Sequence, residues 1–183
     1  MRGPIVLVGL MGSGKSTVGR RLAGLLDKPF VDADDALEER AGRSIADIFA
    51  ADGEDAFRQL ETSLLEELLD RTDEPVVATG GGVVTRATNR ELLAYHRSAI
   101  VVWLDGSPAF LASRLQQQSH RPLLVDADPV EVLTRLHAER RPFYEEVADV
   151  VVDVEQFLHS PQPKQAVADH IAEALRARLG SAS

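Results

Sequence analysis

The chain has 183 residues, of which 44% are apolar and 27% charged, with a formal net charge of −9. This composition is typical of a globular protein with a single domain, and the acidic balance argues against binding to nucleic acid. No run of about 18 apolar residues indicates a membrane span, and the absence of cysteine excludes disulfides, cysteine-bound zinc and thiol catalysis. We expect a cytoplasmic monomer that binds any anionic ligand at a local positive site.

Predicted strands and helices alternate along the chain. The unalternating apolar run at 4–10 is typical of a strand buried on both faces. Further strands are predicted at 28–34, 75–82, 99–105 and 148–154, and helices at about 16–26, 35–42, 44–53, 54–71, 89–96, 107–118, 129–147 and 164–179. The alternation predicts an α/β protein with a parallel sheet covered on both faces. Ligands of such sheets bind at the carboxyl ends of the strands.

The segment GLMGSGKS, from Gly9 to Ser16, fits the phosphate-binding pattern G-x-x-x-x-G-K-[ST] between a predicted strand and a predicted helix. Its backbone N–H groups and the positive end of the helix would hold phosphate oxygens. Lys15 would reach the outer phosphates, and the Ser16 hydroxyl would bind Mg²⁺. The predicted nucleotide-binding residues of this segment are Gly12, Ser13, Gly14, Lys15, Ser16 and Thr17. The segment therefore predicts that the protein binds ATP.

The remaining strand ends favour a small kinase over other nucleotide-binding proteins. The chain has no N-K-x-D motif for reading guanine. The strands end in ATGGG, WLD and VVD, whereas motor and remodelling ATPases usually have an acidic pair after an apolar strand. We therefore expect the phosphate acceptor to be a second small molecule.

Two carboxylates follow the second predicted strand. Asp32 and Asp34 are two residues apart, so strand alternation directs them to the same side. One could support Mg²⁺, and the other could hold the acceptor hydroxyl and take its proton. The alternative is an acidic turn in which Asp34 or Asp35 caps a helix.

Arginines supply candidate sites for an acidic acceptor and for phosphates. Arg58 shares a helix face with Glu54 and Glu61, and could bind a carboxylate or belong to a solvated salt-bridged face. Arg140 stands where an apolar stripe expects an apolar residue, so it needs an anion, either a ligand or a structural Asp or Glu. Arg121, on a loop, could close over the transferring phosphoryl group, and Arg114 could flank the nucleotide. A plain surface position is the alternative for both.

The triplet Gly80, Gly81 and Gly82 ends the third predicted strand. Three consecutive glycines are entropically costly. They could form a wall without side chains that lets a compact acceptor approach the backbone, or they could form only a tight bend.

Together these segments resemble the shikimate kinase family, small P-loop kinases of the nucleoside-monophosphate-kinase type. The resemblance is carried by GLMGSGKSTVGRRLA, FVDADDALEERAGRSIADIFAADGEDAFRQLE, ATGGGVV, VVWLD, RPLL and RRPFYEEVA, in family order over nearly the whole chain. It implies a single P-loop domain (1–183) with a three-layer α/β/α fold and a five-stranded parallel sheet. It also implies a substrate-binding insert at about 33–61 and a lid at about 116–127, and we expect a loose tail at about 180–183.

The resemblance implies transfer of the ATP γ-phosphoryl group to the 3-hydroxyl of shikimate, giving ADP and shikimate 3-phosphate for aromatic amino acid biosynthesis. It implies that Asp34, Arg58, Gly80, Gly81, Gly82 and Arg140 bind shikimate, that Ser16 and Asp32 serve Mg²⁺, that Lys15 and Arg121 bind the phosphates, and that Arg114 lies against adenine. Lys15, Asp34 and Arg121 are the expected catalytic residues. The segment HSPQPKQ departs from the family's adenine-contacting loop in spacing, so its contacts stay open.

Two alternatives accompany this interpretation. A related kinase for another acid, such as gluconate, would share Lys15 and the lid but is not expected to combine Asp34, Arg58, the glycine triplet and Arg140. A regulatory module that binds nucleotide without catalysis is a second alternative, although every catalytic position is filled here.

Overall fold

The computed structural model describes residues 3–96, 98–116 and 128–180. Five strands form one parallel sheet in the order β2-β3-β1-β4-β5. Their bounds are Ile5–Val8 (β1), Phe30–Asp32 (β2), Val76–Ala78 (β3), Ile100–Asp105 (β4) and Val150–Asp153 (β5). The predicted fold class is confirmed.

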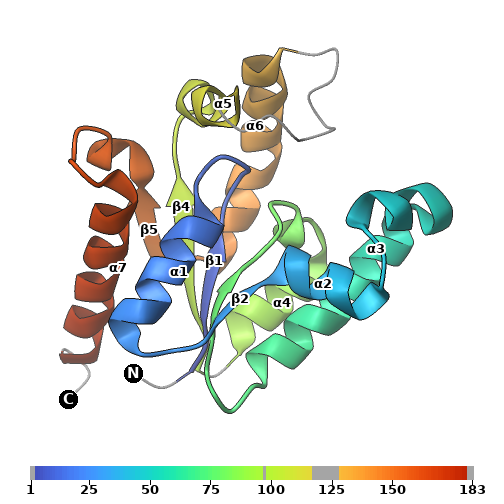
Figure 1. Cartoon of the computed structure of the whole chain (residues 1–183), viewed down its shortest axis with the longest axis horizontal. Coiled ribbons are helices and arrows are strands. Elements are labelled where there is room, and N and C mark those ends of the chain that lie inside the picture. Colours follow the sequence, from blue (N-terminus) through green and yellow to red (C-terminus); the bar gives the residue numbers. More distant parts are fainter. Residues whose placement is uncertain (1–2, 97, 117–127, 181–183) are drawn as a thin grey trace.

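Helices cover both faces of the sheet (Figure 1). They are α1 (Lys15–Leu26), α2 (Ala33–Ala41), α3 (Ile45–Leu69), α4 (Ala87–Tyr95), α5 (Pro108–Gln116), α6 (Pro129–Val147) and α7 (Pro163–Gly180), with short 3₁₀ turns η1 (Val83–Thr85) and η3 (Val154–Phe157). The helices α1 and α7 pack on one face, and α4, α6 and the end of α3 pack on the other. The sequence therefore folds into three layers.

The central strand β1 explains its own unalternating apolar sequence. Ile5 and Leu7 pack into the layer formed with α1 and α7, whereas Val6 and Val8 pack into the opposite layer. All four side chains are fully buried. A strand covered on both faces has no solvent-facing side, so every position favours an apolar residue.

The helices α2 and α3 stand beside the carboxyl end of β2 (Figure 1). The Ser44 side chain caps α3 by accepting a hydrogen bond from the Asp47 N–H. The two helices predicted at 44–53 and 54–71 are one element that is interrupted at Gly53 (φ 82°, ψ 174°). The spacing of Phe57, Leu60, Leu64 and Leu68 predicts one apolar stripe on this helix. Phe57, Leu64 and Leu68 are buried, whereas Leu60 is exposed. That part of the prediction was wrong, because the packed stripe of α3 does not include Leu60.

Several expectations concern residues that the structure does not describe. Residues 117–127 of the predicted lid, which include Arg121, lie outside the described residues, as do residues 181–183 of the predicted tail. Within the described part of the chain, no helix combines the length and apolar character required to cross a bilayer.

Candidate active site

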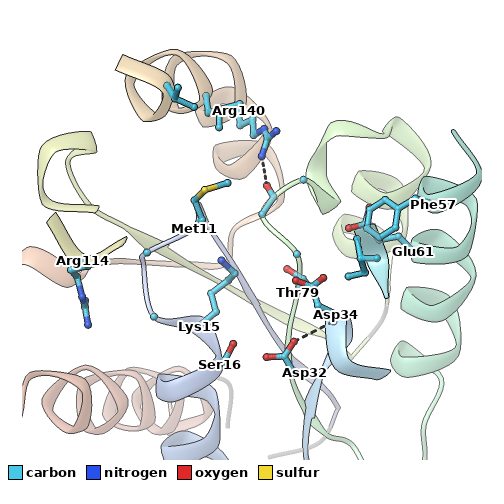
Figure 2. A pocket seen from close by; sticks show the side chains of 18 of the residues that line it. Met11, Lys15, Ser16, Asp32, Asp34, Phe57, Glu61, Thr79, Arg114 and Arg140 are labelled. Atoms are coloured by element: carbon cyan, nitrogen blue, oxygen red, sulfur yellow. Dashed lines mark hydrogen bonds between the residues drawn. The ribbon is translucent and has the colours of Figure 1, made fainter. Parts of the chain in front are cut away.

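A cavity of about 660 Å³ lies where the residues after β1, β2 and β3 meet. Figure 2 shows side chains from these segments and from α3 and α6 directed toward it. The predicted site residues that line it are Gly12, Gly14, Lys15, Ser16, Thr17, Asp32, Asp34, Arg58, Gly80, Gly81, Gly82, Arg114 and Arg140. The fold therefore brings into one cavity nearly all of the predicted residues that the structure describes.

The loop after β1 is shaped to surround an anion. Gly12 has a φ of 85°, and a Cβ there would stand 2.7 Å from the Leu111 carbonyl oxygen, so the loop requires glycine at this position. The Lys15 ammonium donates to the Gly9 carbonyl at 2.7 Å and to the Leu10 carbonyl at 3.0 Å. These bonds hold the ammonium within the loop, beside the amino end of α1.

Ser13 is the described residue of the predicted set that does not line the cavity. Its hydroxyl donates to the Leu10 carbonyl at 2.8 Å, and its backbone N–H donates to the same oxygen at 3.3 Å. Ser13 is fully buried. In this structure it therefore shapes the loop from inside, and its nucleotide contact stays a prediction.

Oxygen ligands suited to Mg²⁺ gather beside the phosphate loop. Figure 2 shows the Ser16 hydroxyl and the Asp32 carboxylate facing the same part of the cavity. Asp32 caps α2, because its Oδ1 accepts the Asp34 N–H at 3.2 Å. The alternative of a helix cap thus applies to Asp32 and not to Asp34 or Asp35. Hard oxygen donors of this kind fit Mg²⁺, which keeps water and phosphate oxygens as its other ligands.

The Asp34 carboxylate lies against the glycine triplet. A Cβ on Gly80 would stand 2.9 Å from Asp34 Oδ1 and 3.1 Å from Glu61 Oε1. The backbone after β3 and the carboxylates of α2 and α3 therefore approach each other closely, with no room for a side chain at Gly80.

Arg58 forms an ion pair with the buried carboxylate of Glu61. Its Nη1 donates to Glu61 Oε2 at 2.7 Å, and the side chains of Arg58 and Glu61 are only 13% and 7% exposed. A more exposed partner, Glu54, lies at 3.4 Å. Burial raises the pKa of Glu61, and the Arg58 charge partly offsets that effect. The pair is therefore a desolvated pair at the cavity wall, not the solvated face considered from the sequence.

Arg140, from α6, lines the same cavity and contacts the glycine triplet. Its Nη1 donates to the Gly81 carbonyl at 3.0 Å (dashed in Figure 2). Among the described residues, no carboxylate forms a salt bridge with Arg140, so the alternative of a structural ion pair is not supported there. Its guanidinium lines the cavity with N–H groups available for an anionic ligand.

Arg114 and Lys164 form a second basic region, next to the phosphate loop. The Arg114 guanidinium lies 3.8 Å from the position of a Cβ on Gly14. Burial lowers the pKa of Lys164, and the charges of Arg114 and Arg21 lower it further. Lys164 is a site residue that the sequence analysis missed. The signal was its place in the segment HSPQPKQ, whose contacts had been left open.

An apolar wall is the other feature that sequence reasoning missed. Phe49 and Phe57 line the cavity with their ring centroids 4.7 Å apart, and Ile45, Met11 and Leu136 are further apolar residues of the cavity lining. Its place in the apolar stripe of α3 predicts only core packing for Phe57. Its neighbour Arg58 gave the available signal, because pockets for small molecules are lined mostly by apolar and aromatic side chains around a few polar groups.

The fold and the site together define a small P-loop kinase with a site for an acidic acceptor. A family model described as shikimate kinase matches residues 11–176. The chain therefore belongs to the shikimate kinase family.

Individual relatives agree with this assignment. A shikimate kinase from Symbiobacterium thermophilum is 51% identical over 148 residues, which cover 80% of this chain and 83% of the relative. The solved structure of a shikimate kinase from Acinetobacter baumannii in complex with shikimate is 38% identical, with a TM-score of 0.85 and coverage of 96% and 94%. A gluconokinase structure from Sinorhizobium meliloti is 26% identical, with a TM-score of 0.58 and coverage of 96% and 97%. This chain is thus less similar to the gluconokinase than to the shikimate kinase, in both sequence and structure.

Proposed function

We propose that this protein transfers the γ-phosphoryl group of ATP to the 3-hydroxyl of shikimate, giving ADP and shikimate 3-phosphate. The observation that carries the proposal is one cavity in which the phosphate loop meets Arg58, Arg140 and the glycine triplet. A nucleotide on the loop and a carboxylate acid on the two arginines would face each other there. The family's acceptor supplies the identity of that acid.

The acceptor is held at two ends. Arg58 and Arg140 bind its carboxylate, because planar guanidinium groups match a carboxylate with two parallel hydrogen bonds. Asp34, whose carboxylate packs against the bare backbone at Gly80, binds the hydroxyl groups at the other end. The Phe49 and Phe57 rings cover an apolar face of the substrate.

In the transfer step, the acceptor oxygen bonds to the γ-phosphorus while the bond from that phosphorus to the β-phosphate oxygen breaks. ADP leaves and the hydroxyl proton is released. Lys15 lies within the phosphate loop and stabilises the charge on the outer phosphates, and the family resemblance assigns Arg121 to the same phosphates. Asp34 orients the hydroxyl and is placed to take its proton.

Mg²⁺ belongs to this proposal, with Ser16 and Asp32 on its protein side. The ion would neutralise charge on the β- and γ-phosphates. We further propose that the enzyme works as a monomer in the cytoplasm, because a protein without cysteine suits a reducing compartment. Sedimentation of the purified protein checks the monomer.

The deciding experiment measures ATP-dependent ADP release with shikimate, gluconate, quinate and nucleoside monophosphates as acceptors. We expect turnover with shikimate, and omission of Mg²⁺ should abolish it. Turnover with only one of the other acceptors would overturn the proposal. ATP hydrolysis or binding without any acceptor turnover would favour the regulatory alternative.

Three variants test the roles assigned here. Lys15→Met should abolish turnover with every acceptor, and Asp34→Asn should reduce kcat by at least about a hundredfold. Arg58→Ala should weaken shikimate binding far more than ATP binding. Equal loss of both affinities would remove Arg58 from the acceptor site.

A further inference from the structure

Tyr144 is a buried tyrosine with no role in the proposed reaction. It lies on α6, one helical turn after Arg140, and is only 1% exposed. Its ring stacks on Trp103 of β4 with centroids 5.5 Å apart. It does not line the cavity. A hydroxyl group at this depth requires a hydrogen-bond partner, and that partner shows what the residue does.

The partner is the backbone of the glycine triplet. The Tyr144 hydroxyl donates to the Gly81 carbonyl at 2.6 Å. Burial raises the pKa of Tyr144, so the hydroxyl keeps its proton and remains a donor throughout the neutral range. The same carbonyl accepts the Arg140 Nη1 hydrogen bond at 3.0 Å. Both donors of this one oxygen thus come from a single face of α6.

This arrangement fixes a peptide that glycine alone would leave mobile. A carbonyl oxygen has two lone pairs, and here Tyr144 and Arg140 each use one. Because the Arg140 guanidinium donates to this peptide, a change in the peptide's orientation would remove or redirect that hydrogen bond. The next residue, Gly82, packs so closely on Arg58 that a Cβ would overlap its guanidinium. One peptide therefore lies between the two arginines that bind the acceptor carboxylate.

We propose that Tyr144 is a positioning residue for the acceptor site: its hydroxyl fixes the Gly81 peptide and, through it, the guanidinium of Arg140. Trp103 in turn holds the Tyr144 ring against β4. The position of the acceptor site is therefore fixed relative to the sheet. Tyr144 itself does not touch the substrate. The inference rests on the proposed function, because the acceptor is taken to be shikimate.

The test is Tyr144→Phe, which keeps the ring and the Trp103 stack but removes the hydroxyl. Steady-state kinetics with each substrate varied should give a shikimate KM raised about three- to tenfold, as expected for one lost hydrogen bond. The KM for ATP should be unchanged. In an Arg140→Ala background the same change should have little further effect on the shikimate KM, because the group that Tyr144 positions is gone.

A matched control separates positioning from stability. Ile171→Val removes one buried methyl group from the layer on the other face of the sheet, and should lower Tm without changing the shikimate KM. A Tyr144→Phe enzyme with a lower Tm but an unchanged shikimate KM would overturn the inference, as would equal rises in both KM values or additive effects with Arg140→Ala. If the unmodified protein does not phosphorylate shikimate, the proposed function fails, and the inference with it.

Discussion

At the scale of single residues, the three glycines after β3 are not equivalent. None of them has a positive φ, so left-handed backbone does not explain their presence. The reason is close approach: Gly80 faces the Asp34 and Glu61 carboxylates, and Gly82 faces the Arg58 guanidinium. At Gly81 a Cβ would meet its nearest neighbour, the Gly9 carbonyl oxygen, at 3.4 Å, which is close to ordinary contact. Gly81 contributes its carbonyl instead.

Alanine substitutions should therefore rank by position. Gly82→Ala pushes the Arg58 guanidinium aside, and because that group is the end of a flexible side chain, stability should fall little while the shikimate KM rises about tenfold or more. Gly80→Ala should act similarly through Asp34. Gly81→Ala is the internal control with a milder effect. Steady-state kinetics and Tm for the three variants check the ranking, and a largest kinetic effect at Gly81 would contradict it.

The buried surroundings of Glu61 disfavour the charged form of its carboxyl group. Its Oε1 is buried without a hydrogen-bond partner, and burial raises its pKa. For a carboxyl group with a raised pKa in the folded state, its contribution to stability is fully present below the unfolded value of 4.5. That contribution is lost as pH rises through the folded value, since the folded state then binds more protons than the unfolded state.

Glu61→Gln removes this titration but keeps an acceptor oxygen for Arg58. The variant's free energy of unfolding, relative to the unmodified protein, should increase as pH rises from 4.5 to 7, by at most about 1.4 kcal/mol per pH unit. Urea unfolding at several pH values measures this difference. A pH-independent difference would show that Glu61 titrates normally.

At the scale of elements, α3 is bent at Gly53 and contributes residues to the acceptor site from both sides of the bend. Ile45 and Phe49 precede Gly53 and Phe57 and Arg58 follow it, and all four line the cavity. The φ and ψ of Gly53 lie in a region that is essentially restricted to glycine. The bend therefore sets the angle between Ile45 and Phe49 on one side and Phe57 and Arg58 on the other.

Gly53→Ala should lower the free energy of unfolding by about 1–3 kcal/mol and raise the shikimate KM, with the ATP KM unchanged. A comparison with Gly42 sharpens this experiment. Gly42 caps α2 in the left-handed region (φ 66°), where asparagine is tolerated. Gly42→Asn should be nearly neutral, whereas Gly53→Asn should be as harmful as Gly53→Ala. Equal tolerance at both positions would contradict the strained bend.

The same scale separates what the sequence predicts from what it cannot. The phosphate loop and β1 are local patterns, and Arg140 was identifiable because it interrupts an apolar stripe. Tyr144 shares that apolar stripe with Leu133 and Leu136, so its position in the sequence indicates only packing in the core. Its bond to Gly81 spans 63 residues, and no local pattern encodes such a contact. Leu60 was misassigned because a continuous helical stripe was assumed along α3, whose packed side excludes that residue.

At the scale of the whole molecule, the cavity has an excess of positive charge although the protein as a whole is negative. The protein has a formal charge of −9, yet six basic and three acidic residues line the cavity among the described residues. A positive cleft in an acidic protein concentrates anionic substrates at one place and repels them elsewhere. On the nucleotide side Arg114 and Lys164 add to the charge of Lys15, and no salt bridge of Arg114 or Lys164 is found within the described parts of the chain.

Lys164→Gln tests that field at the nucleotide. The ammonium lies in the cavity wall near Arg114, so its loss should raise the KM for ATP about three- to tenfold at low ionic strength, with the shikimate KM nearly unchanged. The effect should shrink as salt is added, because exposed charges are screened within about 10 Å at 0.1 M. Arg176→Gln is the matched control: it makes the same charge change on an exposed residue of α7, about 18 Å further along the helix. Equal effects of the two substitutions would assign the attraction to net charge and remove Lys164 from the nucleotide site.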